Sequence, residues 1–528
     1  MNFDGKRVLV TGSTMGIGHG IAEMFLEAGA TVAINGRKTD SVARAVRDFD
    51  TPHAIAVPGD VASVAGCRAI VDTAVSKLGG LEILVNNVGI CPLSYMMDVT
   101  EEHWDQVIAV NLRSALFCSK FALPALRRSQ GNIVMVASIA GLCAGPTDSF
   151  VYAISKGGMV AMTKGLAIEL APDGVRVNAV CPGYIDTPMI QAENAATGGQ
   201  VHEFIRNTTP LRRLGSVREC ASSVLYFASD LGGYCTGTIL SNDGGCMAGG
   251  TWGGANAGAP VNSPSTYLPT PTTNTLFDFT GRRVLITGST LGIGRAAAEG
   301  FLSLGATVAV NGRTPASVAR AIREMGGGPR LIPAPGDLAA SEDRRRTVAK
   351  ALADLGGLDV LVNNAGRGDD CVVDDLTEEY WQRMTDLNLK AGFFVAQACV
   401  PELRKTRGNV IHVSSILGLT AGPPGSVVYA TTKGAVVQMM RMMALALAPD
   451  GVRVNAFCPG WIDTPMIQHD NTAAGDDALY KYIASVAPVG RVGTPQETVG
   501  AILYLAAAMN SYTTGAILSA DGGLAAGH

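Results

Sequence analysis

The sequence predicts an α/β protein with two doubly wound parallel-sheet domains in tandem. Short Val/Ile/Leu-rich runs alternate with longer segments of helical periodicity, which is the pattern of consecutive βαβ units. The whole pattern then occurs a second time. TGSTMGIG at Thr11 returns as TGSTLGIG at Thr287, an offset of 276 (287 − 11), and YAISK at Tyr152 returns as YATTK at Tyr429, an offset of 277 (429 − 152).

The repeat defines the expected domain borders. Copy one is expected over residues 1–247 and copy two over residues 276–528. The segment between them, 248–275, is rich in Gly, Pro, Ser, Thr and Asn. This composition is typical of a linker that is flexible where glycine dominates and more extended where Pro and Thr dominate.

Each copy is expected to contain seven strands. In copy one they are RVLVTG, TVAINGR, HAIAVPGD, LEILVNN, GNIVMVAS, VRVNAVCPG and GTILSNDGG. In copy two they are RRVLITG, TVAVNGR, RLIPAPGD, LDVLVNN, GNVIHVSS, VRVNAFCPG and GAILSADGG. Continuous β-branched runs suit strands that are covered on both faces. Intervening segments such as IAEMFLEAGA carry apolar residues at helical spacing, and glycine lies near their C-terminal ends.

Composition excludes several classes of function. The chain has 528 residues, 47% hydrophobic and 16% charged, which are globular values. Its net charge of −4 argues against nucleic acid or an anionic membrane as the main partner. No apolar run of about 20 residues is apparent, and MNFDGKRVLVTG enters the first strand with no room for a signal peptide, so a cytoplasmic location is expected.

The cysteines and histidines indicate no metal site. The eleven cysteines are odd in number, many lie in apolar runs, and no CxxC pair or Cys/His cluster occurs. The seven histidines have no metal-ligand spacing. Reduced, buried thiols and no structural metal are therefore expected.

A glycine-rich loop follows the first strand of each copy and precedes a helix, with the spacing GxxxGxG. Close approach of backbone to a pyrophosphate tolerates no Cβ, and a helix N-terminus supplies N–H donors. An ordinary glycine turn is the alternative, but the loop occurs in the same setting twice. The residues expected to contact a dinucleotide are Gly12, Ser13, Thr14, Gly16, Ile17 and Gly18, and Gly288, Ser289, Thr290, Gly292, Ile293 and Gly294.

The end of the second strand favours NADP. An NAD site usually has an acidic residue here, which binds the ribose 2′-OH. Both copies instead have Asn-Gly-Arg, and the arginine could bind a 2′-phosphate. A solvated arginine with NAD as cofactor remains the alternative. The residues concerned are Asn35 and Arg37, and Asn311 and Arg313; Asp60 and Val61, and Asp337 and Leu338, are expected to meet the adenine.

A tyrosine and a lysine share one helical face in each copy. Tyr152 and Lys156 are four residues apart (156 − 152). A tyrosine hydroxyl titrates near 10, and a nearby ammonium is expected to lower that pKa toward neutrality. Ser138 lies at a strand end 14 residues earlier (152 − 138), where it could hydrogen-bond a carbonyl oxygen. The counterparts in copy two are Tyr429, Lys433 and Ser415.

On these motifs both copies resemble the short-chain dehydrogenase/reductase family. The matching residues are TGSTMGIG, NNVG, Asn111, Ser138, Tyr152, Lys156 and Pro182-Gly183, and TGSTLGIG, NNAG, Asn388, Ser415, Tyr429, Lys433 and Pro459-Gly460. The resemblance covers almost everything outside the linker. It implies Rossmann-type domains, a nicotinamide cofactor, and hydride transfer to or from a small-molecule carbonyl or alcohol.

The resemblance also implies residue roles. The two tyrosines would exchange the proton, the lysines would also bind the nicotinamide ribose, the serines would orient the substrate, and the asparagines, Asn111 and Asn388, would hold a relay water. Further cofactor contacts are implied for Asn86, Asn87, Gly89, Pro182, Gly183, Ile185 and Thr187, and for Asn363, Asn364, Gly366, Pro459, Gly460, Ile462 and Thr464. Val88 departs from the family's usual alanine beside the cofactor.

The expected substrate walls differ between the copies. After NNVG the chain reads ICPLSYMM, which is apolar, whereas after NNAG it reads RGDDC, which is small and charged. The segments before each catalytic tyrosine and after each IDTPMIQ differ too. Loops in such places set specificity, so distinct pockets are expected, although drift could explain any single difference.

Three readings follow. The first is a bifunctional NADP-dependent ketoreductase/alcohol dehydrogenase. The second is a redox-neutral epimerase, in which one site oxidises an alcohol and the other reduces the ketone. In the third, one copy is catalytic and the other is a structural partner or nucleotide-binding scaffold. All three are compatible with an intramolecular pseudo-dimer of the copies, and with a dimer of chains.

Overall fold

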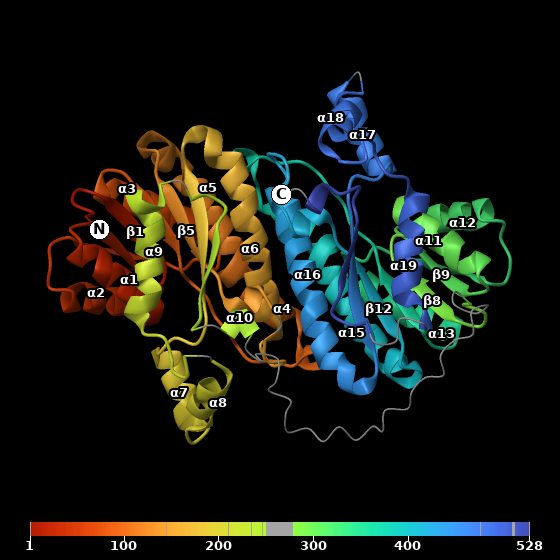
Figure 1. Cartoon of the computed structure of the whole chain (residues 1–528), viewed down its shortest axis with the longest axis horizontal. Coiled ribbons are helices and arrows are strands. Elements are labelled where there is room, and N and C mark those ends of the chain that lie inside the picture. The colour runs from red at the N-terminus through yellow and green to blue at the C-terminus, as the bar shows by residue number, and fades with distance from the viewer. Residues whose placement is uncertain are drawn as a thin grey trace. The chain divides into compact units, whose positions relative to one another are not determined.

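The computed structural model describes residues 2–143, 145–209, 211–233, 235–244, 246–249, 278–475, 477–508 and 513–526. Apart from residues 248 and 249, the expected linker lies outside these ranges. The described residues form two seven-stranded parallel sheets flanked by helices, one in each copy (Figure 1). The predicted fold class, two Rossmann-type α/β domains in tandem, is confirmed.

The first sheet has the strand order β3-β2-β1-β4-β5-β6-β7. This order reverses direction after β1, so crossover helices cover both faces. Its strands are β1 Arg7–Val10, β2 Thr31–Gly36, β3 Ala54–Pro58, β4 Ile83–Asn86, β5 Asn132–Val136, β6 Arg176–Pro182 and β7 Ile239–Asn242. Its helices are α1 Gly16–Glu27, α2 Thr39–Asp48, α3 Val64–Leu78, α4 Glu101–Ile108, α5 Ser114–Ser129, α6 Phe150–Leu170, α7 Pro188–Ala196, α8 Gln200–Thr208, α9 Val217–Ala228 and α10 Cys246–Gly249.

The second sheet has the equivalent order, β10-β9-β8-β11-β12-β13-β14. Its strands are β8 Arg283–Ile286, β9 Thr307–Gly312, β10 Leu331–Pro335, β11 Val360–Asn363, β12 Asn409–Val413, β13 Arg453–Pro459 and β14 Ile517–Ala520. Its helices are α11 Gly292–Ser303, α12 Pro315–Glu324, α13 Ser341–Leu355, α14 Glu378–Thr385, α15 Gly392–Thr406, α16 Val427–Leu447, α17 Pro465–Ala474, α18 Ala478–Val486 and α19 Pro495–Ala506.

The residues of the central strands are mostly buried on both faces, as their composition predicts, whereas the outer strands β3, β7, β10 and β14 are partly accessible. Val8, Leu9 and Val10 of β1 are fully buried, and Val8 and Val10 share one hydrophobic cluster with Phe25 of α1. Helix α1 packs against α9, and α3 packs against α5. Full burial of one such aliphatic side chain contributes about 1.5–3 kcal/mol, so these layers supply much of the stability of each sheet.

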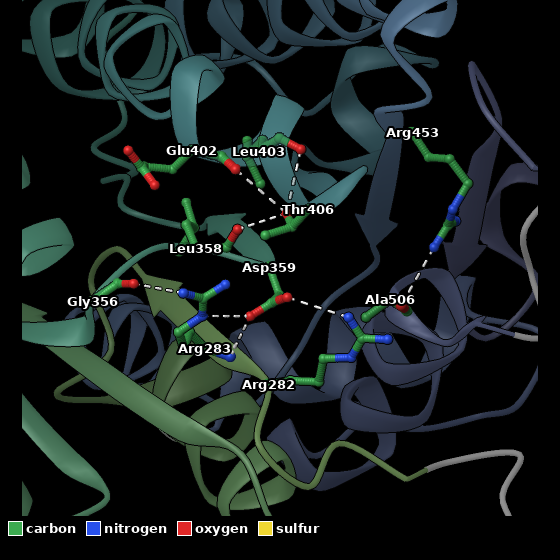
Figure 2. Close-up of polar contacts among 10 residues, drawn as sticks. All are labelled: Arg282, Arg283, Gly356, Leu358, Asp359, Glu402, Leu403, Thr406, Arg453 and Ala506. Carbon is green, nitrogen blue, oxygen red and sulfur yellow. Dashed lines mark hydrogen bonds and ion pairs between the residues drawn. The ribbon is translucent and has the colours of Figure 1, made fainter. Parts of the chain in front are cut away.

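Ionic contacts brace the amino-terminal edge of the second sheet, as Figure 2 shows. Asp359, just before β11, accepts a hydrogen bond from Arg283 Nε at 2.8 Å and another from Arg282 Nη1 at 3.2 Å. Partial burial alone would raise the pKa of Asp359, but these hydrogen bonds outweigh burial and lower it. Thr406, at the end of α15, donates to the carbonyl of Leu358 at 2.8 Å. The glycine-rich loop and the predicted catalytic residues follow the strands at the opposite, carboxyl-terminal edge of the sheet.

One helical stretch has the length and hydropathy of a membrane span, although none was expected from the sequence. It runs over Glu101–Ser129, with a mean hydropathy of 1.3 in its most apolar window. Two-thirds of that window (67%) is buried inside the protein. The stretch therefore packs as a core helix of the first unit.

Candidate active site

The loop after β1 is shaped by glycines in conformations that other residues rarely adopt. Gly12 and Gly16 have φ values of +66° and +58°. A Cβ at Gly12 would lie 2.9 Å from Val88 Cγ2, and a Cβ at Gly18 would lie 2.3 Å from the carbonyl oxygen of Gly12. The loop is thus a bare backbone cradle at the N-terminus of α1, which fits a pyrophosphate group.

The same cradle occurs in copy two. Gly288 and Gly292 have φ values of +61° and +55°. A Cβ at Gly294 would lie 2.4 Å from both the Gly288 carbonyl oxygen and Asn364 Nδ2. Close approach of backbone therefore explains the third glycine of the motif in both copies.

Two asparagines that are expected to contact the cofactor also hold the first loop in shape. Asn35 is buried; its Oδ1 accepts from Gly12 N at 3.2 Å and its Nδ2 donates to Val57 O at 3.0 Å. Asn87 Nδ2 donates to the carbonyls of Thr11 and Gly12 at 2.9 and 3.1 Å. These side chains therefore fix the shape of the glycine-rich loop.

Copy two repeats these bonds. Asn311 Oδ1 accepts from Gly288 N at 3.1 Å, and Asn364 Nδ2 donates to the carbonyls of Thr287 and Gly288, each at 3.0 Å. Ser289 Oγ accepts from Asn311 N at 2.9 Å, as Ser13 does in copy one. The two loops are therefore built by the same hydrogen-bond pattern.

The arginines after the second strands are exposed. Arg37 and Arg313 follow β2 and β9, and within the part of the chain that the structure describes neither guanidinium has a hydrogen-bond or ion-pair partner. A Cβ at Gly36 would lie 2.7 Å from Thr14 Cγ2, so this turn leaves no room for a side chain between Thr14 and the arginine. Both arginines are available to an anionic group.

The residues expected near the adenine follow β3 and β10. Asp60 Oδ1 accepts from Ala62 N at 2.9 Å, and Val61 is buried. Asp337 Oδ1 accepts from Ala339 N at 3.0 Å, and Leu338 is buried. Each aspartate thus accepts a hydrogen bond within its own turn, and the apolar residue that follows it is buried.

The loop after β6 lies beside the glycine-rich loop that follows β1. A Cβ at Gly183 would lie 2.8 Å from Asp243 Cα, so the turn after Pro182 is tightly packed. Ile185 is buried and pairs with Gly215 in an isolated bridge. A Cβ at Gly16 would lie 3.8 Å from Thr187 Cγ2, which places Thr187 beside the cradle.

Copy two has the same convergence. There a Cβ at Gly292 would lie 3.2 Å from Thr464 Cγ2, and Ile462 pairs with Gly493. Gly460 meets Asp521 as closely as Gly183 meets its counterpart, with a Cβ placed 2.6 Å from the aspartate Cα. In each copy the two expected halves of the cofactor site are therefore adjacent.

The predicted catalytic residues of copy one come together at the carboxyl end of β5. Ser138 follows this strand, and its Oγ accepts from Ala140 N at 3.1 Å. Lys156 Nζ donates to the carbonyl of Val136 at 2.8 Å and lies 5.7 Å from the ring centroid of Tyr152. Strand β5 and helix α6 thus position the serine, the lysine and the tyrosine.

Asn111 connects this set to the loop after β4. It lies in a π-helical turn, Ala109–Arg113, of the kind often found at functional sites. Its Nδ2 donates to Ile90 O at 2.9 Å and to Ser155 Oγ at 3.1 Å, and its Oδ1 accepts from Ile90 N at 2.8 Å. The asparagine side chain therefore ties the loop carrying Gly89 to the catalytic helix.

Burial dominates the electrostatics of Tyr152 and Lys156. It raises the pKa of Tyr152, with a further rise from the neighbouring Cys91 thiol, and an interaction with the Ser138 hydroxyl offsets only part of the rise. Burial also lowers the pKa of Lys156 to about 8. The sequence argument expected the lysine to bring the tyrosine pKa toward neutrality; in the structure, desolvation outweighs that effect.

The catalytic set of copy two is arranged alike. Lys433 Nζ donates to Val413 O at 3.0 Å, and burial lowers its pKa to about 8. Ser415 Oγ accepts from Leu417 N at 3.2 Å, and Tyr429 precedes Lys433 by one turn of α16. Asn388 is buried in the π-helical turn Asp386–Ala391.

Asn388 makes the bonds of its counterpart in copy one. Its Nδ2 donates to Arg367 O at 2.9 Å and to Thr432 Oγ1 at 3.3 Å, and its Oδ1 accepts from Arg367 N at 2.8 Å. A Cβ at Gly366 would lie 3.3 Å from Asn388 Oδ1 and 3.4 Å from Lys433 Nζ. The loop carrying Arg367 is therefore held directly beside the lysine.

Asn86 and Asn363 differ from the other expected cofactor residues. Both are buried at the ends of β4 and β11. Asn86 Nδ2 donates to Ser119 Oγ at 3.0 Å and contacts Met135 Sδ at 3.4 Å, whereas Asn363 Nδ2 donates to Gly392 O at 2.8 Å. Asn86 therefore connects the end of β4 to α5, and Asn363 connects the end of β11 to α15.

Several neighbours of the catalytic groups were not foreseen. The carbonyls of Val136 and Val413 bind the lysines, and no residue-type signal can show a backbone partner. Cys91 acts electrostatically on Tyr152, a closeness that its position just after NNVG could have suggested. His412 was missed because it occupies one position in an otherwise apolar strand. Among the described residues, no group of three or more His, Cys, Asp or Glu side chains could hold a metal ion.

Comparisons with known proteins agree with this geometry. The family profile described as Enoyl-(Acyl carrier protein) reductase matches residues 12–247 and again residues 288–525. An uncharacterized short-chain type dehydrogenase/reductase, y4vI, of Sinorhizobium fredii is 31% identical over 535 residues, which covers 98% of this chain and 92% of that protein.

Single-copy relatives match about half of the chain. The D-beta-hydroxybutyrate dehydrogenase of Rhizobium meliloti is 34% identical, over 46% of this chain and 99% of its own length. The 3-oxoacyl-[acyl-carrier-protein] reductase FabG of Vibrio cholerae is 37% identical, over 46% of this chain and 98% of its own length. This chain belongs to the short-chain dehydrogenase/reductase family, as an oxidoreductase of alcohol or carbonyl groups with a nicotinamide cofactor.

Proposed function

We propose, starting from this family membership, that the chain is a bifunctional NADP-dependent ketoreductase/alcohol dehydrogenase with a working site in each copy. The observation that carries the proposal is the recurrence of the whole catalytic arrangement. In both copies a lysine binds the last carbonyl of a central strand, and an asparagine in a π-turn ties the NNxG loop to the catalytic helix. A scaffold copy would have no need to keep all of these bonds.

The roles of the residues follow from their environment. A raised pKa keeps Tyr152 a neutral phenol at physiological pH, so it can donate its proton to the oxygen of a carbonyl that is being reduced. The Ser138 hydroxyl, at the adjoining strand end, would orient that oxygen. Lys156, held through Val136, would bind the ribose, and Asn111 would hold the relay water. When bound, the nicotinamide supplies or accepts the hydride. Tyr429, Ser415, Lys433 and Asn388 would act alike in the second site.

NADP is the proposed cofactor at both sites. The cradle of Gly12, Gly16 and Gly18 would receive the pyrophosphate, because Gly12 and Gly16 have positive φ values and a Cβ at Gly18 would collide with the Gly12 carbonyl. Arg37 and Arg313 are exposed at the strand ends, where each could form charge-assisted bonds with a 2′-phosphate. NAD would lose these bonds and should bind more weakly.

Different substrates are proposed for the two sites. In copy one Leu93 and Tyr95, after NNVG, are exposed apolar side chains, with 57% and 59% of their surface accessible. In copy two Arg367 Nη2 pairs with Asp369 Oδ2 at 2.6 Å in the equivalent loop. An apolar rim beside one tyrosine and a charged rim beside the other favour ketones of different polarity.

Tyrosine variants provide the test. NADPH and NADH oxidation would be followed across a panel of aldehydes and ketones for wild type, Tyr152→Phe and Tyr429→Phe. Each variant should lose a different part of the activity, because each phenol serves one site. If one variant loses everything and the other nothing, the second copy is a structural or nucleotide-binding partner. No NADPH turnover on any ketone would contradict the reductase assignment.

A redox-neutral epimerase is the second candidate, favoured by differing walls beside matching cofactor cradles. One copy would oxidise a secondary alcohol and the other would reduce the ketone from the opposite face. The assay is inversion of a chiral alcohol with only catalytic amounts of NADP. A strict requirement for stoichiometric cofactor would exclude this reaction.

Domain borders and assembly belong to the same proposal. We take residues 1–247 and 276–528 as the domains, 248–275 as the linker, and the two copies as an intramolecular pseudo-dimer. Limited proteolysis should then cut first within 248–275, and sedimentation of the full chain should show one or two chains. A stable four-chain particle would contradict the pseudo-dimer.

A further inference from the structure

A small cavity lies behind the catalytic asparagine of copy two. Its volume is about 10 Å³, and its lining includes Thr287, Asn363, Asn388, His412 and Val413. A cavity of this size holds about one water molecule, provided that polar groups face it. The lining connects strand β12 with the π-helical turn that carries Asn388.

His412 gives this cavity an unusual chemistry. Its side chain is buried, at 1% exposure, opposite Asn363 in the parallel pairing of β11 and β12. Among the residues that the structure describes, none forms a hydrogen bond with the buried Nε2. Burying such a group without a partner is costly, so an occupant that bonds to it is favoured.

In copy one, other side chains occupy the positions that correspond to His412 and its neighbour on the adjoining helix. Met135 occupies the position of His412, and Ser119 occupies that of Ala396 (412 − 277 and 396 − 277). There Asn86 Nδ2 bonds to Ser119 Oγ at 3.0 Å and contacts Met135 Sδ at 3.4 Å. Copy two has no hydroxyl at this position and has an imidazole in place of the thioether. The His412 Nε2 is therefore left without a hydrogen-bond partner among the described residues.

Other polar residues line the same cavity. Its lining includes Thr287 and Asn363, together with Leu387 and Asn388 of the π-helical turn Asp386–Ala391. The cavity is lined by this turn on one side and by His412 on the other. Lys433 is close enough to His412 to influence it electrostatically, so the cavity adjoins the catalytic set.

We propose that His412 is a positioning residue of the second site: its Nε2 binds one buried water, and this water supports the turn that carries Asn388. The inference rests on the proposed function of that site. His412 touches neither substrate nor cofactor. It acts through Asn388, whose side chain holds the Arg367 loop beside Lys433. Copy one needs no such water, because Met135 fills the equivalent space.

The kinetic test compares two replacements in the full-length protein. His412→Met copies the first site and removes the bond to the water, whereas His412→Gln keeps a polar end of similar reach. In the Tyr429-dependent reaction, His412→Met should lower kcat about two- to tenfold, the range of one hydrogen bond, with KM nearly unchanged. His412→Gln should stay within about twofold of wild type, because its amide can hold the water.

Controls separate positioning from a general packing effect. Met135→His in copy one should leave the Tyr429-dependent reaction unchanged. Rescue by glutamine is the readout that a packing role would not give, since glutamine fills the space no better than methionine. Equal loss of kcat in both His412 variants, or full activity of His412→Met, would overturn the positioning role.

A crystal structure of the wild-type chain tests the water itself, without any turnover. At high resolution an ordered water should lie within hydrogen-bond distance of His412 Nε2, about 2.7–3.2 Å. A protein atom at that position, or no density there, would refute the proposal even if both sites prove active. If the water is present but Tyr429→Phe removes no activity, the proposed function has failed and the water site stands.

Discussion

Acid should loosen the second unit more than the first, and His412 is the reason. Burial, with a smaller effect from the Lys433 cation, lowers the pKa of His412 from its ordinary 6.5 to about 3. Above pH 6.5 the imidazole is neutral in both folded and unfolded chains. Below pH 6.5 the unfolded chain takes up a proton that the folded chain refuses, so the stability of the second unit falls as pH drops from 6.5 toward 3.

The size of the effect follows from the pH interval. At pH 4.5 the solution is two units below the unfolded pKa of 6.5, and each unit corresponds to about 1.4 kcal/mol. The second unit should therefore lose about 3 kcal/mol through His412 alone between pH 7.5 and pH 4.5. A domain of this kind is stable by about 5–15 kcal/mol, so the loss is a large fraction of the total.

Hydrogen exchange measures the two units separately in one full-length chain. The free energy of opening would be read from peptides of β12 and of β5 in wild type and in His412→Met. Carboxylates and Lys433 are common to both proteins, so their effects cancel in the comparison. The variant should retain about 3 kcal/mol more stability in β12 at pH 4.5 than the wild type, relative to pH 7.5, and β5 should not change.

Met135→His provides the matched control, because it places an imidazole at the same position of copy one. Acid sensitivity should then appear in β5 as well, while β12 keeps the sensitivity that His412 gives it; in the double variant Met135→His/His412→Met it should appear in β5 alone. An equal fall in β12 stability in wild type and His412→Met would refute the reasoning. It would mean that His412 is protonated in the folded protein or that water reaches it freely.

Three further changes test the cofactor and catalytic sites. Gly18→Ala should reduce NADPH binding from two sites to one in calorimetric titration, because the added Cβ would lie 2.3 Å from the Gly12 carbonyl; unchanged stoichiometry would contradict the cradle. Arg37→Ser should raise the Kd of the first site for NADPH about 10- to 100-fold while NADH binding stays the same, and a parallel loss for both would exclude 2′-phosphate recognition. Since the pKa of Lys156 is lowered to about 8, a Tyr152-dependent rate that needs the ammonium should decline above that pH, whereas a flat profile to pH 10 would argue that its charge is dispensable.

Most of the fold could be predicted from the sequence because the buried strands are marked by their composition. β1 and β8 are short β-branched runs followed by glycine, and both are central strands in the structure. The catalytic elements were equally visible, since Tyr152 and Lys156 share a helical face whatever surrounds that helix. These predictions depend only on the spacing of nearby residues, which can be read directly from the sequence.

What the sequence left out depends on the surroundings of a residue. Asn35 has the residue type and position of a ligand-binding side chain, and its carboxamide also bonds to the backbone of Gly12 in the loop and of Val57 in β3. The pKa of Tyr152 could not be obtained from the spacing to Lys156, because desolvation depends on how the whole site is packed. Such properties belong to contacts between segments far apart in the chain.

The two copies show which of those contacts can change. Where backbone meets backbone, as at Gly18 and Gly294, both copies keep glycine, since any side chain would collide. Where side chain meets side chain, a pair of residues can change together. Ser119 and Met135 of copy one satisfy Asn86 directly, and the paired changes to Ala396 and His412 remove one bond and create a need for another. The duplicated chain therefore keeps its cofactor cradles alike while the support behind each catalytic asparagine diverges.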